Sequence, residues 1–276
     1  MSVDKPSLPG GPAHLVSSGM DERIARMSKI LSTSSGVDAT LTFVGYGLFL
    51  VGSQVSKLES LALPALSRRN TSPSSQKSHA NAPLLLKLAA LASGAKNLAA
   101  MCADVRTFTR LWGLLGVYAM ARRQYLEPAS DALTRAVTCT QTLSLGLYYF
   151  YENAYYLAGK GVLQGWTRED IGRWARVSMR LFLAYVAMEY VRLYRARQLR
   201  LARKQRAMVR GVSDAERREF AAEEAAWTKT ALINVAYTPL CLHWVSEKGM
   251  LSDGVVGALM SYVGWIKVKG AWAATA

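Results

Sequence analysis

Apolar residues recur at spacings of three and four along much of this chain, which is the repeat of an amphipathic helix. In the first such stretch, residues 41–58, they put one apolar seam along a helix that needs a partner. The preceding residues 1–35 contain three prolines and a Gly-Gly pair and predict a flexible lead, within which residues 21–31 form the one candidate helix. The seam of the first long helix consists of Leu41, Val44, Leu48, Val51, Val55 and Leu58.

A second helix is predicted at residues 84–110, after a Ser-rich linker at residues 67–83 that has no apolar periodicity. Lys87 and Arg106 fall at the borders of its apolar stripe, where their alkyl stems can lie on hydrocarbon while their charges reach phosphate headgroups. Two interpretations stay open, a helix lying in a membrane surface and a core-facing helix of a globular protein, because both have this amphipathic pattern. Under the first, the membrane-inserting residues are Leu84, Lys87, Leu88, Leu91, Leu98, Val105 and Arg106.

The third predicted helix, residues 131–158, has no charge between positions 136 and 151. It approaches the roughly 20 apolar residues that a membrane span needs, but its threonines, serine and glutamine make it marginal. Five tyrosines crowd its second half, which is typical of rings near lipid headgroups and also of an aromatic core. Glu152 is a functional candidate if it lies at membrane depth, whereas near an interface it would snorkel or pair with Lys160.

A fourth helix is predicted to start at Thr167, with Asp170 as its capping-box partner three residues on. Its continuation is strongly basic, with eight Lys or Arg residues and no acid between positions 192 and 210. Three interpretations compete for this basic run: contact with anionic lipid, a nucleic-acid arm, or a solvated helix face. The run consists of Arg192, Arg195, Arg197, Arg200, Arg203, Lys204, Arg206 and Arg210.

The C-terminal part predicts two more helices. Ser213 and Glu216 form a capping box that opens the first, and Pro239 is expected to kink or break it within the uncharged residues 230–246. The last apolar segment, residues 254–266, carries one continuous stripe of small residues, which lets another helix approach closely. This small-residue stripe consists of Gly254, Gly257, Ser261 and Gly264.

The composition adds membrane affinity to the helical pattern. The chain has 276 residues, a formal net charge of +15, 51% hydrophobic residues and only 19% charged residues. A disordered protein is excluded, and a nucleic-acid binder or a soluble enzyme would seldom be both this basic and this apolar.

No strand period recurs, so we expect an all-α, membrane-associated bundle of about five to seven long amphipathic and apolar helices, with residues 36–276 as one domain. None, one or two of the segments 136–158 and 230–266 are expected to cross a membrane.

Catalytic and metal-binding chemistry is nearly missing from the sequence. No phosphate-binding glycine loop, zinc-protease motif or nucleophile elbow occurs. The three cysteines lack the spacing of a disulfide framework or a zinc site, and Cys241 and His243 point to different sides of a helix. We therefore expect a protein without catalytic residues, metal or cofactor.

Three segments, residues 104–116, 151–163 and 251–264, carry a family resemblance. They read DVRTFTRLWGLLG, YENAYYLAGKGVL and LSDGVVGALMSYVG, and the C-terminal block is the most specific of the three. In this order and spacing the segments resemble the peroxisomal biogenesis factor eleven family in its fungal branch. The resemblance extends over residues 36–272, and the chain departs from the family pattern in the N-terminal lead and the Ser-rich linker.

The resemblance implies a non-enzymatic peroxisomal membrane protein that promotes elongation, proliferation and fission of the organelle. It also implies that an amphipathic helix inserts into one leaflet, and residues 84–110 match that helix in this chain. The implied partners are anionic membrane lipids, further copies of the chain and the peroxisomal fission machinery, without nucleic acid. A peroxisomal membrane pore for small metabolites is the alternative that the resemblance leaves open.

Overall fold

The computed structural model describes residues 18–69 and 78–275, and for residues 62–69 and 78–85 it describes the backbone only. The described residues form helices and short connections without a strand, which confirms the predicted all-α fold. Six of the helices have 21 residues or more, in line with the five to seven long helices expected. The elements are α1 (Ser18–Leu31), α2 (Ser34–Arg69), α3 (Ser78–Thr109), the 3₁₀ turn η1 (Arg110–Trp112), α4 (Gly113–Leu126), α5 (Ala132–Gly159), α6 (Arg168–Arg210), α7 (Asp214–Val245) and α8 (Asp253–Ala273).

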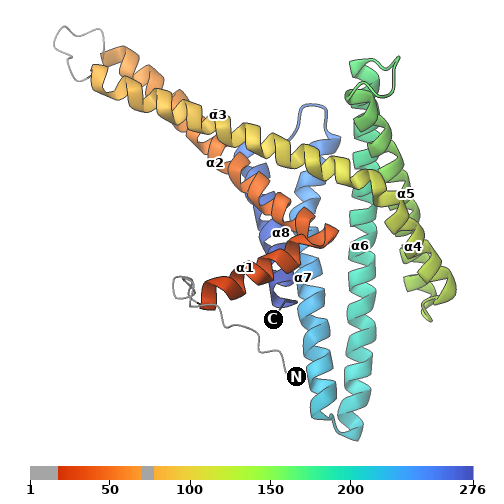
Figure 1. Cartoon of the computed structure of the whole chain (residues 1–276). Helices are drawn as coiled ribbons and strands as arrows, with labels where there is room; N and C mark the ends of the chain where they lie inside the picture. Colours follow the sequence, from red (N-terminus) through yellow and green to blue (C-terminus); the bar gives the residue numbers. More distant parts are fainter. Residues whose placement is uncertain (1–17, 70–77, 276) are drawn as a thin grey trace, which may run out of the picture.

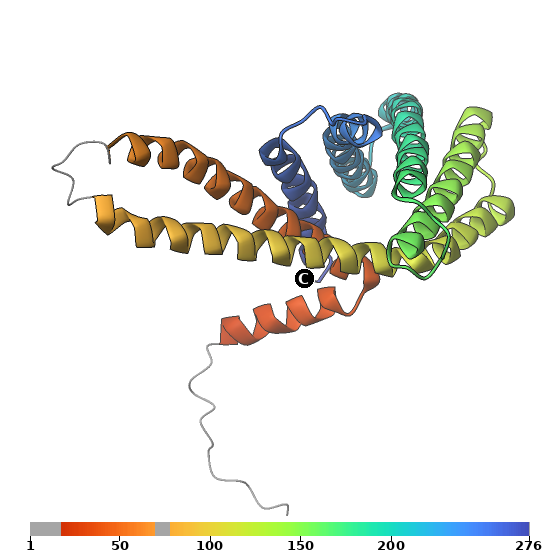
Figure 2. The same ribbon diagram turned by 90° about the horizontal axis from the view of Figure 1, so that it is seen from above.

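The helices form two groups, which α3 joins on one side (Figure 1). They are also joined where α7 meets α8, at the hydrophobic core of Leu240, Val256 and Met260. In the first group, α2 and α3 make a long antiparallel hairpin and α8 packs along α2. In the second, α5 lies against α6, and α6 lies against α7. Figure 2, seen from above, shows α3 running from the hairpin across to α4 and α5. One continuous helix therefore connects the outer end of the first group to the second.

Two predicted boundaries differ from the observed ones. The N-terminal lead is helical from Ser18, because α1 covers the candidate helix expected at residues 21–31, while residues 1–17 lie outside the described part. The Ser-rich linker predicted at residues 67–83 is shorter at both ends, since α2 runs to Arg69 and α3 begins at Ser78.

Side-chain caps fix where the later helices start. Thr167 with Asp170 and Ser213 with Glu216 make the two predicted capping boxes, in which each side chain bonds the other residue's backbone N–H. Between α6 and α7 the chain turns at Gly211, whose φ of 87° favours glycine. The α6–α7 hairpin is thus set by local sequence.

Pro239 was expected to kink or break its helix, and a break is not found, because α7 runs continuously from Asp214 to Val245; a kink stays a prediction. Packing on both sides of the proline outweighs the lost backbone hydrogen bond. Leu240 and Cys241 are fully buried, and Asn234 Nδ2 donates to the carbonyl of Val186 on α6 at 3.1 Å.

Among the described helices, one is long and apolar enough to cross a bilayer, and it is Ser34–Leu61 within α2. The two segments that the sequence suggested, 136–158 and 230–266, do not meet the same requirement. Polar residues in α5 and charged residues in α8 lower the hydropathy of these helices.

Candidate membrane-facing surface and polar cavity

Half of the predicted apolar seam of α2 is exposed and half is partly buried, whereas its small residues are buried. Ala39, Thr42 and Ser53 are 3%, 0% and 4% exposed, whereas Val51 and Leu58 of the seam are 56% and 66% exposed. The helix was expected to need a partner, and it packs on both α3 and α8. Small side chains let helix backbones approach closely, so small residues of α2 contact these helices. Of its large residues, Tyr46 and Phe49 pack on the core of Leu240, Val256 and Met260.

The same arrangement holds for α3. Its buried apolar residues are Ala92, Ala99 and Cys102, which lie toward α2. On the outward side, Leu91, Leu98 and Val105 are 68%, 47% and 46% exposed, and Lys87 is exposed as well. Leu88 is half-buried, and the side chain of Leu84 lies outside the described part. The outward row continues through Met101, Phe108, Trp112 and Leu115.

Arg106 was expected to reach lipid headgroups from the border of the stripe, but it is buried. Arg106 Nε donates to Asp38 Oδ1 at 2.9 Å, and Lys267 Nζ donates to the other oxygen of the same carboxylate at 3.3 Å. These contacts join α3 to α2 and α8. Arg106 therefore holds three helices together and does not face outward, because a buried cation requires a charged partner.

Glu152 pairs with Arg110 and not with Lys160, which instead pairs with Asp104 at 2.6 Å. Arg110 binds both carboxylate oxygens of Glu152, at 2.7 and 2.8 Å, and Tyr148 Oη donates to one of them at 2.8 Å. Glu152 is 1% exposed, so this bidentate pair lies inside the protein. It fixes the turn between α3 and α4 against α5.

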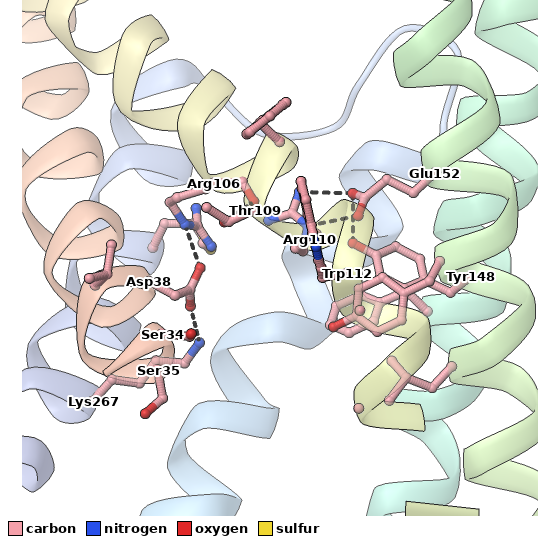
Figure 3. Close-up of a pocket in the computed structure, with 18 of the residues that line it drawn as sticks. Ser34, Ser35, Asp38, Arg106, Thr109, Arg110, Trp112, Tyr148, Glu152 and Lys267 are labelled. Atoms are coloured by element: carbon pink, nitrogen blue, oxygen red, sulfur yellow. Dashed lines mark hydrogen bonds and ion pairs between the residues drawn. The ribbon is translucent and has the colours of Figure 1, made fainter. Parts of the chain in front are cut away.

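A cavity of about 1430 Å³ lies between these two ion-pair clusters. Figure 3 shows Asp38, Arg106 and Lys267 on one side of it and Arg110, Glu152 and Tyr148 on the other. Hydroxyl groups of Ser34, Ser35 and Thr109 also line it. Its remaining wall is mostly aromatic and apolar, with Tyr46, Leu145, Met179, Phe182, Tyr237, Trp244 and Met260. The cavity thus combines charged and apolar surfaces.

Most of the basic run is paired with carboxylates within the chain. Arg200 contacts Glu224 at 2.5 Å, and Arg203 contacts Glu219 and Glu223 on α7. The other pairs are Arg192 with Glu189, Arg195 with Asp131, and Arg210 with Glu216.

The hydrogen bonds from Arg195, and then those from Thr134, hold the pKa of Asp131 well below its usual range. Five members of the run therefore have carboxylate partners, and contact of the run with anionic lipid stays a prediction. Arg197, Lys204 and Arg206 are the exposed members for which the described residues include no carboxylate partner.

The small-residue stripe of α8 packs on α2 of the same chain. A Cβ added at Gly264 would lie 2.5 Å from the backbone nitrogen of Phe43, and one added at Gly257 would lie 3.0 Å from Cα of Leu50. A Cβ added at Gly254 would meet the side chain of Gln54 at 2.4 Å, and the hydroxyl of Ser261 is buried. The predicted close approach is present, and its partner is α2, so the stripe is not left free for a second copy.

Cys241 and His243, which could suggest catalysis, have contacts that fit a structural role. Burial raises the pKa of the Cys241 thiol to about 12, which removes it as a thiolate nucleophile. His243 Nδ1 accepts hydrogen bonds from the backbone N–H groups of Met250 and Leu251, each at 2.9 Å. The described residues contain no group of three or more His, Cys, Asp or Glu that could hold a metal ion.

The sequence matches the family described as Peroxisomal biogenesis factor 11 (PEX11) over residues 85–272, which is more than half of the chain. No curated protein and no solved structure matches it. The family match includes α4 to α7, nearly all of α8 and most of α3, and the fungal branch stays a prediction. The chain therefore belongs to the Peroxisomal biogenesis factor 11 family, and it is a peroxisomal membrane protein with a role in peroxisome biogenesis.

Proposed function

We propose that this protein elongates the peroxisomal membrane before fission by inserting the outward side of α3 into one leaflet. The observation that carries the proposal is the exposed apolar row of α3, in which Leu91, Leu98 and Val105 face away from α2. Membership of a peroxisome biogenesis family supports this direction.

The physical basis is apolar burial on a rigid support. Burying a Leu or Val side chain fully stabilises by about 1.5–3 kcal/mol, so three such residues supply a substantial part of the affinity for a bilayer. Because α3 is fixed to α2 by Ala92, Ala99 and the Arg106 ion pair, the row enters the leaflet as one wedge. Area added to one leaflet favours curvature. The exposed Lys87 adds attraction to anionic lipid.

The triple variant Leu91→Gln, Leu98→Gln, Val105→Gln tests the proposal. We expect it to lose tubulation of liposomes that contain anionic lipid, as seen by electron microscopy, while circular dichroism in detergent stays unchanged. A control with Leu201→Gln, Met208→Gln and Val209→Gln changes three exposed apolar residues of α6 and should tubulate normally. Full tubulation by the α3 variant would contradict the proposal.

A pore for small metabolites is the second candidate, and the charged cavity is the observation that favours it. A pore needs a continuous polar path across the bilayer. Among the described helices only Ser34–Leu61 has the length and composition of a span, which favours remodelling. Flux of a small solute from vesicles that contain the protein would separate the two functions.

We also propose that the protein has no catalytic activity and binds no cofactor and no nucleic acid. Anionic lipids, further copies of the chain and the peroxisomal fission machinery are its proposed partners. Because the stripe of α8 packs on α2, contacts between copies would use other surfaces.

A further inference from the structure

We propose that the cavity between α2 and α5 binds a single lipid molecule. Its anionic phosphate headgroup would contact the cluster of Asp38, Arg106 and Lys267, and its acyl chain would lie against the aromatic wall. This site is separate from the outward row of α3.

The charges around the cavity favour an anionic headgroup. Arg110 and Glu152 neutralise one another, and Arg176, which also lines the cavity, pairs with Glu247 at 3.6 Å. In contrast, the single carboxylate of Asp38 is shared by Arg106 and Lys267. The cluster of Asp38, Arg106 and Lys267 therefore carries one positive charge that no carboxylate balances. Charge inside a protein is costly unless it is paired, so an anion at this position is stabilised. The side chain of Lys267 is 30% exposed and can turn toward such a ligand.

The other walls favour an acyl chain. Tyr46, Phe182, Tyr237 and Trp244 present aromatic surface to the cavity, and Met260 adds a flexible apolar side chain. A cavity of about 1430 Å³ exceeds the range of roughly 300–1,000 Å³ that is usual for small-molecule sites. Its size fits an amphiphile better than a free inorganic anion.

The rim of the cavity connects it to the outward row of α3. Phe108 and Trp112 line the cavity, and they are also 51% and 57% exposed at the end of that row. A lipid from a bilayer that contacts this row could enter past these two rings. This step rests on the proposed function, because it places the rim beside the membrane.

The test uses the full-length protein in detergent, so that bilayer insertion plays no part. It is titrated with dihexanoyl phosphatidic acid below its micellar concentration, and separately with dihexanoyl phosphatidylcholine, glycerol phosphate and inorganic phosphate. Native mass spectrometry gives the stoichiometry, and tryptophan fluorescence gives the affinity. We expect phosphatidic acid to bind one to one and at least tenfold more tightly than each of the other three.

Two variants assign binding to the cavity. Lys267→Gln removes the surplus charge and should weaken binding of phosphatidic acid at least tenfold. Its matched control is Lys269→Gln, which removes the same charge from an exposed residue of α8 that does not line the cavity. Ala175→Trp places a large side chain at the cavity wall without a change of charge and should weaken binding as strongly. Circular dichroism confirms that each variant is folded.

Several results would overturn the inference: no one-to-one complex with the unmodified protein, equal binding of phosphatidylcholine, or equal binding of free phosphate. The same holds if Lys267→Gln and Lys269→Gln bind alike. The α3 triple variant should still bind phosphatidic acid in detergent, and Lys267→Gln should still tubulate liposomes. Failure of the lipid site and failure of the membrane wedge are therefore distinguishable.

Discussion

The α2–α8 pair and the α5–α6 pair hold two helices together by different contacts. In the first pair, glycines of α8 bring the two backbones close, as at Gly264 beside Phe43. In the second pair, buried polar side chains bond across the interface. Gln141 Nε2 donates to Glu189 at 2.7 Å, and Ser144 Oγ donates to the carbonyl of Leu181 at 2.6 Å.

Both pairs direct large apolar side chains outward. Val51 on α2 and Phe150 on α5 are 56% and 53% exposed, although both belong to helices with buried polar or small faces. A protein in water normally buries its large apolar residues, whereas helices in lipid associate through small residues and hydrogen bonds. The two pairs thus add different contacts, small residues in one and buried hydrogen bonds in the other, to interfaces that also contain large side chains, such as Tyr148 of α5 against Phe182 of α6 with ring centroids 5.2 Å apart.

A second polar contact of α5, the ion pair of Glu152 with Arg110 of η1, is expected to be the most sensitive to a single change. Replacing Glu152 with Leu leaves Arg110, whose side chain is 25% exposed, beside Tyr148 without its carboxylate. Loss of one partner of a buried ion pair costs about 3–5 kcal/mol, and we expect a fall of this size in the free energy of unfolding, measured by urea titration in detergent.

The control for this change is Glu127→Leu, at the residue that follows α4. Its partner is Arg123 at 3.8 Å, and both side chains are more than three-quarters exposed, at 83% and 76%. Exposed pairs contribute about 0–1 kcal/mol. An equal, small effect of both variants would mean that water reaches the Arg110–Glu152 pair.

The close-packed interface of α2 and α8 should not tolerate added side-chain volume. In Gly264→Ala the new methyl group would meet the backbone of Phe43, which has no flexible end to move aside. Overpacking typically costs about 1–3 kcal/mol, so we expect this loss in the same urea titration. Gly47→Ala on α2 is the matched control, because nothing lies within 4 Å of a Cβ added there. If the two alanine variants are equally stable, α2 and α8 are not in backbone contact.

Local signals in the sequence were sufficient for the fold class and for several boundaries. The capping boxes at Thr167 and Ser213 begin α6 and α7 as predicted, because a cap depends on residues three positions apart. The small-residue stripe likewise predicted a close helix approach. These local signals do not tell which helix packs on the stripe.

The site itself could be predicted only in part. Periodicity located the apolar rows of α2 and α3, but it does not tell whether a row faces a core or a membrane, so both interpretations stayed open for α3. The ion pairs of Arg106 with Asp38 and of Arg110 with Glu152 join residues 68 and 42 positions apart. A single sequence carries no signal for such distant contacts, and for Glu152 it suggested a functional acid at membrane depth or a pair with Lys160 instead of the pair with Arg110.

A third helix pair, α6–α7, provides a baseline for the comparison, because its distal part is joined by exposed ion pairs. Arg203 is 51% exposed and contacts Glu219 and Glu223, so Arg203→Gln should reduce stability by about 0–1 kcal/mol. That effect should shrink further at high salt, where exposed charges are screened.

One turn earlier, Arg200 is 8% exposed, pairs with Glu224 and also donates to the carbonyl of Glu223 at 3.3 Å. Arg200→Gln should therefore cost more, and its cost should change little with salt. Urea titrations at low and high salt measure the loss of stability of both variants. The same salt dependence for the two would show that burial does not make the two ion pairs differ.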